Sequence, residues 1–206
     1  AWQVAATTEP TCVAYNTIFE CAGGFRPGAY VVVYGAGPIG LAAIQLAKAA
    51  GAAKVIAFEV SKVRQDLAKK VGADYVLDPA REKPAEAVME ITHGEGADLS
   101  VEAAGAPEKT IPEMEKTLAV GGKIAVVGRA AQRVPMYLER FQTRKAKLFG
   151  AQGHSGYGIF PSVIRMMGAG LIDNSRIITA TFPLTQGVEA IKRATERRDG
   201  KIMILP

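Results

Sequence analysis

The chain has 206 residues, of which 49% are hydrophobic and 22% are charged. This balance is typical of a globular protein with a substantial core, and it excludes an intrinsically disordered chain. The 25 Lys and Arg residues outnumber the 20 Asp and Glu residues, but they are dispersed along the chain and are not interleaved with aromatic residues. We therefore expect no nucleic-acid partner.

Two further features bear on where the protein works. Cys12 and Cys21 form neither a disulfide framework nor a CxxC pair, which favours a reducing, cytoplasmic setting. The longest uncharged stretch, residues 28–46, carries two glycines and a proline near its centre. Because these residues interrupt helical hydrogen bonding, we interpret the stretch as protein core and expect no membrane association.

The predicted elements alternate along most of the chain. After an N-terminal section that we expect to be irregular, short β-branched segments alternate with segments of helical periodicity. The predicted strands cover residues 30–34, 54–59, 75–78, 98–105, 123–128 and 146–152. The predicted helices cover residues 38–50, 61–71, 85–94 and 108–118, with Ser61 as a candidate cap. Six strands in this rhythm predict the α/β class and a doubly wound parallel sheet, the Rossmann fold.

The C-terminal tail follows a different pattern. A helix is predicted over residues 160–167, an extended segment over 177–184, a helix ending near residue 197 and a last strand over 201–205. These elements either extend the sheet or belong to a second unit. We divide the chain into three parts, which are an N-terminal connecting segment (1–22), a dinucleotide-binding domain (23–152) and a C-terminal segment (153–206).

The first predicted strand runs into the sequence GAGPIG, which has the spacing GxGxxG. Gly35 permits a tight turn, Gly37 lets the backbone approach a pyrophosphate, and Gly40 lets the following helix lie against the strand. Pro38 suits the first helical turn, where no backbone donor is needed. The free amides at this helix start attract phosphate, so the context of strand, glycine turn and helix predicts a dinucleotide site.

An acidic residue, Glu59, stands at the end of the second predicted strand. Its carboxylate is suited to accept hydrogen bonds from both hydroxyls of an adenosine ribose, and it would repel a 2′-phosphate in the same place. NAD is therefore favoured over NADP. The alternative rests on Arg64 and the nearby Lys62, which offer positive charge to that phosphate.

Other chemistry is less well supported by the residues. Methyltransferases share a glycine-rich turn and a following acid, but they usually lack a third glycine at the position of Gly40. His93 is expected to be a surface residue, whereas His154 follows the end of a strand and either faces the nicotinamide or has no role. The two Cys and two His residues are too scattered to build a tetrahedral zinc site, so we assign no catalytic residue.

The order of motifs resembles a known family over nearly the whole chain, namely the cofactor-binding half of the zinc-containing medium-chain alcohol dehydrogenases. The similarity is to the branch that acts on sorbitol, threonine and inositol-derived ketones. The motifs that carry it are EPTCVAYN, GFRPGAYVVVYGAGPIGLAAIQLAKAAGAAKVIAFE, AKKVGADYVLDP, VEAAGAP, GGKIAVVG and the terminal KIMIL.

The resemblance implies roles for individual residues. Glu9 matches an acidic residue at or beside the catalytic zinc, and Lys201 matches a basic residue that reaches the pyrophosphate. The remaining matches line the cofactor, with Ile39 behind the nicotinamide, Ala104 and Gly105 on the adenosine side, and Val127 and Gly128 bordering the nicotinamide.

The resemblance also implies an activity, the NAD-dependent oxidation of a secondary alcohol or polyol, with zinc lowering the pKa of the alcohol. In the family, an N-terminal domain that this chain does not contain supplies the zinc ligands, and the segment after residue 152 packs on that domain. Because the chain lacks an initiator Met, we favour a fragment of a longer enzyme. The alternative is a standalone dinucleotide-binding or redox-sensing module. Family members are often dimers or tetramers, so we expect a homo-oligomer formed through the edge of the sheet.

Overall fold

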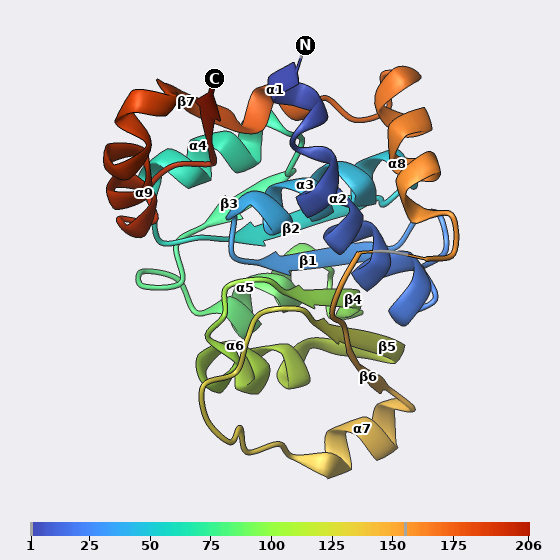
Figure 1. Cartoon of the computed structure of the whole chain (residues 1–206). Coiled ribbons are helices and arrows are strands. Elements are labelled where there is room, and N and C mark those ends of the chain that lie inside the picture. Colours follow the sequence, from blue (N-terminus) through green and yellow to red (C-terminus); the bar gives the residue numbers. More distant parts are fainter. Residues whose placement is uncertain (1, 155) are drawn as a thin grey trace.

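The computed structural model describes residues 2–154 and 156–206. Six parallel strands form one sheet in the order β3-β2-β1-β4-β5-β6 (Figure 1). They are β1 (Tyr30–Tyr34), β2 (Lys54–Phe58), β3 (Tyr75–Leu77), β4 (Ala97–Glu102), β5 (Leu118–Val126) and β6 (Lys147–Gly150). The strand order reverses between β1 and β4, which confirms the predicted doubly wound Rossmann sheet.

The sheet is buried on both faces, which explains why its central strands read as unbroken apolar runs. Val31 and Val33 of β1 belong to one core, and Val32 and Tyr34 belong to the core on the opposite face. Helices α3 (Pro38–Ala49) and α4 (Lys62–Lys70) cover the first face. Helices α5 (Pro84–Ile91), α6 (Pro107–Met114) and α7 (Leu138–Arg144) cover the second.

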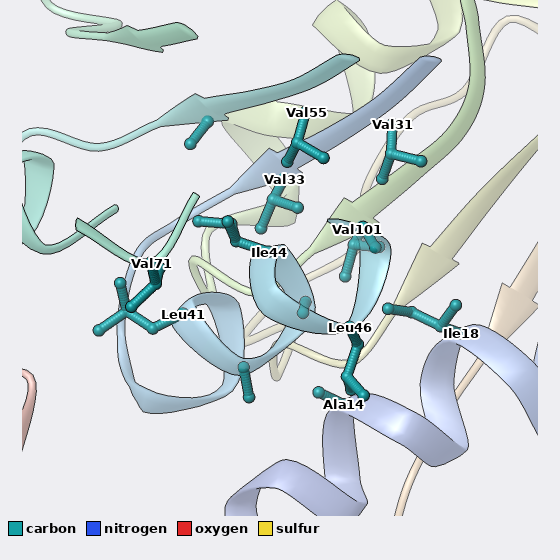
Figure 2. Packing of buried hydrophobic residues seen from close by; sticks show 14 of the residues in the cluster. Ala14, Ile18, Val31, Val33, Leu41, Ile44, Leu46, Val55, Val71 and Val101 are labelled. Carbon is teal, nitrogen blue, oxygen red and sulfur yellow. The ribbon is translucent and has the colours of Figure 1, made fainter. Parts of the chain in front are cut away.

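The expectation of an irregular N-terminal section is wrong. The section forms α1 (Trp2–Ala5), α2 (Thr8–Tyr15) and a π-helical segment, η1 (Asn16–Cys21). Pro10 is compatible with α2 because it lies within the first turn, where the missing N–H would have no helical partner. Figure 2 shows that Ala14 and Ile18 lie close to Leu46 of α3, so this section is part of the first core.

The C-terminal elements do not extend the main sheet. Helix α8 (Ile159–Gly168) and η3 (Asn174–Ile177) pack in the first core, whereas β7 (Ile178–Pro183), η4 (Leu184–Gln186), α9 (Gly187–Thr195) and β8 (Lys201–Leu205) form a second unit. Strands β7 and β8 pair with each other in parallel, in a sheet of their own. This resolves the alternative that the sequence left open, while the three domain boundaries stay predictions.

Several element boundaries differ from the predictions. Strand β4 ends at Glu102 and not at residue 105, because Gly105 takes a φ of +67° and the chain turns. Strand β5 begins at Leu118, after the short η2 (Glu115–Thr117), and helix α7 was not predicted. Ser61 precedes α4 but its side chain makes no cap.

Candidate functional site

The glycine turn lies between β1 and α3, at the carboxyl edge of the sheet. Gly35 has a φ of +91°, and its N–H donates to the carbonyl of Phe58 at 2.8 Å. A Cβ at this position would lie 2.7 Å from the backbone of Ala104. The fold itself therefore requires glycine here, both for the backbone angle and for the close approach of the β4 turn.

The other two glycines of the motif differ in what they allow. A Cβ on Gly40 would overlap the carbonyl oxygen of Gly35, so α3 packs directly on the turn. Gly37 has an ordinary φ of −70°, and a Cβ there would come no closer than 3.8 Å to the Arg64 guanidinium. The fold does not require Gly37 to lack a side chain. Its bare backbone leaves open the start of α3, which no side chain caps.

Glu59 follows β2 and is bound to the glycine turn itself. Its side chain is buried, with 6% exposed. Oε2 accepts a hydrogen bond from the N–H of Ala36 at 2.7 Å, and Oε1 accepts one from the N–H of Ser61 at 2.9 Å. The sequence reasoning expected a ribose ligand, and the structure adds that this carboxylate holds the turn in shape.

Arg64 of α4 lies beside the open side of the turn, next to Gly37. Its Nε donates to the carbonyl of Asp199 at 2.8 Å, which ties α4 to the C-terminal unit. Burial lowers the pKa of Arg64, and the nearby Glu59 carboxylate opposes that shift. Lys62, the other cation that favoured NADP, instead pairs with Asp66 at 2.6 Å on the exposed face of α4.

The glycine turn forms the first wall of the site. The ends of β4 and β5 form the second wall, next to it. The N–H groups of Val127 and Gly128 donate to the carbonyl of Glu102 at 3.0 and 2.9 Å. A Cβ on Gly128 would lie 2.6 Å from the amide nitrogen of Gly105, so these two loops are in close contact. The residues expected on the adenosine and nicotinamide sides therefore come together.

A cavity of about 310 Å³ opens beside this wall. Three residues predicted from the resemblance line it, namely Ile39, Val127 and Gly128. The residues that the sequence reasoning missed are Val13, Arg129, Ala151, Gln152 and Gly153. A parallel sheet places its sites at the carboxyl ends of strands, and this rule pointed to residues 151–153 after β6. No local signal pointed to Val13.

Glu9 and His154 form a pair at the edge of the cavity. The His154 Nε2 lies 3.3 Å from the Glu9 Oε1, and the imidazole packs edge-on against Phe160. Glu9 stands one turn before Val13 on α2, and His154 follows Gly153, both of which line the cavity. The sequence offered both side chains as candidates but gave no reason to pair them.

Two other candidates lie apart from the turn. His93 is exposed after α5, as expected for a surface residue. Lys201 begins β8 opposite Ile178, two residues after the Asp199 that Arg64 contacts. Its role at the pyrophosphate stays a prediction.

Within residues 2–154 and 156–206, no group of three or more His, Cys, Asp or Glu side chains is arranged to hold a metal ion. No helix in the same residues has the length and apolarity needed to cross a bilayer.

Known proteins resemble this chain in both sequence and structure. It is 47% identical over 189 residues to scyllo-inosose 3-dehydrogenase of Thermotoga maritima, covering 90% of this chain and 48% of the relative. It is 33% identical over 206 residues to L-threonine 3-dehydrogenase of Thermococcus kodakarensis, covering 99% of this chain and 58% of the relative. The chain thus spans about half the length of the curated relatives it matches.

Solved structures give the same result. A provisionally assigned alcohol dehydrogenase from Thermotoga maritima superposes with a TM-score of 0.93 at 44% identity, over 97% of this chain and 52% of that one. The 2R,3R-butanediol dehydrogenase of Bacillus subtilis superposes with a TM-score of 0.87 at 26% identity, over 98% and 57%. The family model for zinc-binding dehydrogenases matches residues 38–169, which begin directly after Gly37 and include Glu59 and the ends of β4 and β5. The chain belongs to the zinc-binding dehydrogenase family.

Proposed function

We propose that this chain is the NAD-binding portion of an oxidoreductase that transfers a hydride between a secondary alcohol or polyol and nicotinamide. The observation that carries the proposal is the contrast within the glycine motif. Gly35 and Gly40 are required by packing, whereas Gly37 leaves the start of α3 free for a ligand. A free helix start with a bare backbone is suited to a pyrophosphate.

The residues around the turn fit an extended dinucleotide. The free backbone N–H groups in the first turn of α3 would bind the pyrophosphate. Pro38 has no N–H of its own, and its ring favours the backbone angle of the first helical position. Ala104 and Gly105 would line the adenosine side. Ile39, which lines the cavity, would back the nicotinamide, and Lys201 would reach the pyrophosphate. The nicotinamide, when bound, accepts or returns the hydride.

Glu59 supports NAD over NADP. Among the residues that the structure describes, its carboxylate accepts two backbone N–H bonds, at 2.7 and 2.9 Å, so further lone pairs remain for the ribose hydroxyls. A 2′-phosphate at that place would meet the same negative charge. The guanidinium of Arg64 offsets part of that repulsion, but Lys62 is engaged with Asp66.

The zinc of the proposed full-length enzyme does not find a complete site in this chain. Glu9 and His154 offer two donors, whereas a catalytic zinc takes three protein ligands and an open position. We therefore place Glu9 at or beside a zinc whose other ligands come from the part of the relatives that this chain does not cover.

The C-terminal segment supports the proposed division of the molecule. Its second unit exposes a group of apolar side chains, which are Leu184, Val188, Ile191 and Ile204. Such a group is more typical of a packing surface than of a free one. We propose that residues 153–206 pack on the catalytic domain. A cytoplasmic location and a homo-oligomer formed through β6 complete the proposal.

A titration with NADH tests the cofactor assignment. The wild-type chain should bind NADH in the micromolar range, measured by the change in nicotinamide fluorescence, while showing no alcohol oxidation on its own. Gly37→Ala should weaken NADH by about tenfold or more, since the methyl group occupies the place of the phosphate. Gly168→Ala on α8 is the matched control, because its Cβ meets nothing within 4 Å and NADH binding should not change.

Two outcomes would count against this function. No NADH binding at millimolar concentration would remove the proposal. Binding of NADH with no turnover of polyols by the full-length protein would favour a standalone dinucleotide-binding or redox-sensing module.

A further inference from the structure

A second carboxylate, Glu102, is buried at the end of β4, beside Tyr34 of β1. It is fully buried, with 0% exposed. Its Oε1 accepts hydrogen bonds from the N–H of Ala104 at 3.1 Å, from the N–H of Ala106 at 3.3 Å and from the Thr110 hydroxyl at 3.4 Å. One carboxylate oxygen therefore collects the donors of the turn that leads into α6.

The other oxygen of Glu102 faces the end of β5. Oε2 is buried and has no hydrogen-bond partner within the described residues. A Cβ on Gly128 would overlap this oxygen, so the carboxylate lies directly against that glycine. The backbone carbonyl of Glu102 also accepts from Val127 and Gly128. Glu102 thus contacts both loops of the second wall.

The turns after β1 and β4 are neighbours, and each leads into a helix, but they differ in how their amides are used. After β1, Glu59 takes the N–H of Ala36, and the first amides of α3 are left without a side-chain cap. After β4, the carboxylate of Glu102 takes the N–H groups of both Ala104 and Ala106. Backbone N–H groups that converge in a turn form a concavity suited to an anion. Here the carboxyl group of Glu102 occupies that concavity.

We propose that Glu102 is a positioning residue for the cofactor: its buried carboxylate fills the β4 turn in place of an external anion and holds Ala104 and Gly105 against Val127 and Gly128. This inference rests on the proposed function, because it assigns those four residues to the dinucleotide. Because Glu102 fills the turn after β4, the turn before α3 is the one that stays open to the pyrophosphate. It also explains why glycine stands at residue 128, where any side chain would displace the carboxylate.

A carboxyl group is costly to bury at this place, and its hydrogen bonds to the turn offset part of that cost. Burial raises its pKa, and the backbone N–H groups of Ala106 and Ala104 oppose the shift. An uncharged residue of the same shape avoids the cost of burying a charge. Glu102→Gln should therefore remain folded but hold the turn less tightly, because a neutral amide oxygen accepts weaker hydrogen bonds than a carboxylate does.

The test compares NADH binding by three variants, with the melting temperature of each as the check on folding. Glu102→Ala should weaken NADH by about tenfold, since the two turn amides lose a charged acceptor. Formate at millimolar concentration should restore most of that affinity by entering the vacated space, and chloride at the same ionic strength should not. Glu102→Gln should also weaken NADH, without rescue, because the space is filled.

Glu113→Gln is the matched control, since Glu113 on α6 also accepts a backbone N–H bond, from Ala85 at 3.1 Å, away from the wall. It should bind NADH as the wild type does. Folded Glu102 variants with wild-type affinity would overturn the inference alone. A loss of NADH binding in Glu102→Ala that formate does not restore would also overturn it. Failure of the wild-type chain to bind NADH would remove the proposed function and this inference with it.

Discussion

At the scale of single residues, the site depends on where side chains are missing and on two buried carboxylates. Gly35 and Gly40 have no room for a Cβ, whereas a Cβ on Gly37 would fit without a close contact. Glu59 and Glu102 each bind backbone amides of a βα turn. Gly35, Gly40 and the two carboxylates therefore have structural roles that exist before any ligand binds, and the proposed ligand site is what these contacts leave open.

Glu59→Gln is predicted to reduce the preference for NAD over NADP by about tenfold, because it removes the negative charge that a 2′-phosphate would meet. The amide keeps the size of the side chain and one oxygen that can accept the N–H of Ala36. The measurement is a pair of titrations, with NADH and with NADPH. An unchanged ratio of the two dissociation constants would contradict the assignment of Glu59 to the ribose.

At the scale of elements, one buried polar residue joins three segments that are far apart in the chain. Asn174 in η3 is 1% exposed. Its Nδ2 donates to the hydroxyl of Thr11 in α2 at 2.8 Å, and its Oδ1 accepts from Nε2 of Gln45 in α3 at 3.2 Å. The contact anchors the C-terminal unit to the face of the sheet that α2 and α3 cover.

Asn174→Ala is predicted to lower the free energy of unfolding by about 1–3 kcal/mol, since the Thr11 and Gln45 side chains lose a buried partner. Urea unfolding followed by circular dichroism measures the loss. Thr143→Ala on the exposed α7 is the control and should change stability little. Equal stability of both variants would show that the three segments are held by apolar packing alone.

At the scale of the whole molecule, the main sheet ends in an exposed edge. Strand β6 is the last in the order, and Leu148 on it is 44% exposed. An unpaired strand edge with apolar side chains is a ready surface for pairing with another chain. The exposed apolar group of the second unit, Leu184, Val188, Ile191 and Ile204, lies on a different part of the molecule, around β8 and α9.

Leu148→Asp is predicted to convert the proposed homo-oligomer into a monomer, because a charge at the edge strand opposes pairing between two copies. Size-exclusion chromatography with light scattering gives the mass. Val120→Asp, an equally polar change at an exposed position of β5, should leave the mass unchanged. A wild-type chain that is monomeric, or a variant with the wild-type mass, would exclude β6 as the interface.

Much of the fold and part of the site followed from local patterns in the sequence. The six strands, the glycine turn and Glu59 were predicted because apolar runs, helical periodicity and glycine spacing depend on neighbouring residues. The N-terminal helices were missed, since Pro10 looks like a helix breaker until its place in the first turn is known. Helix α7 was missed because it buries no residue and so shows no clear apolar face.

The amino-acid order alone therefore determined the Rossmann fold, the place of the glycine turn and the acid beside it. The folded chain was needed to pair Glu9 with His154, to bring Arg64 to Asp199 and to bury Glu102 against Gly128. The physical reason is distance along the chain. Periodicity and turn chemistry are set by residues a few positions apart, whereas these contacts arise only when separate strands and helices pack together.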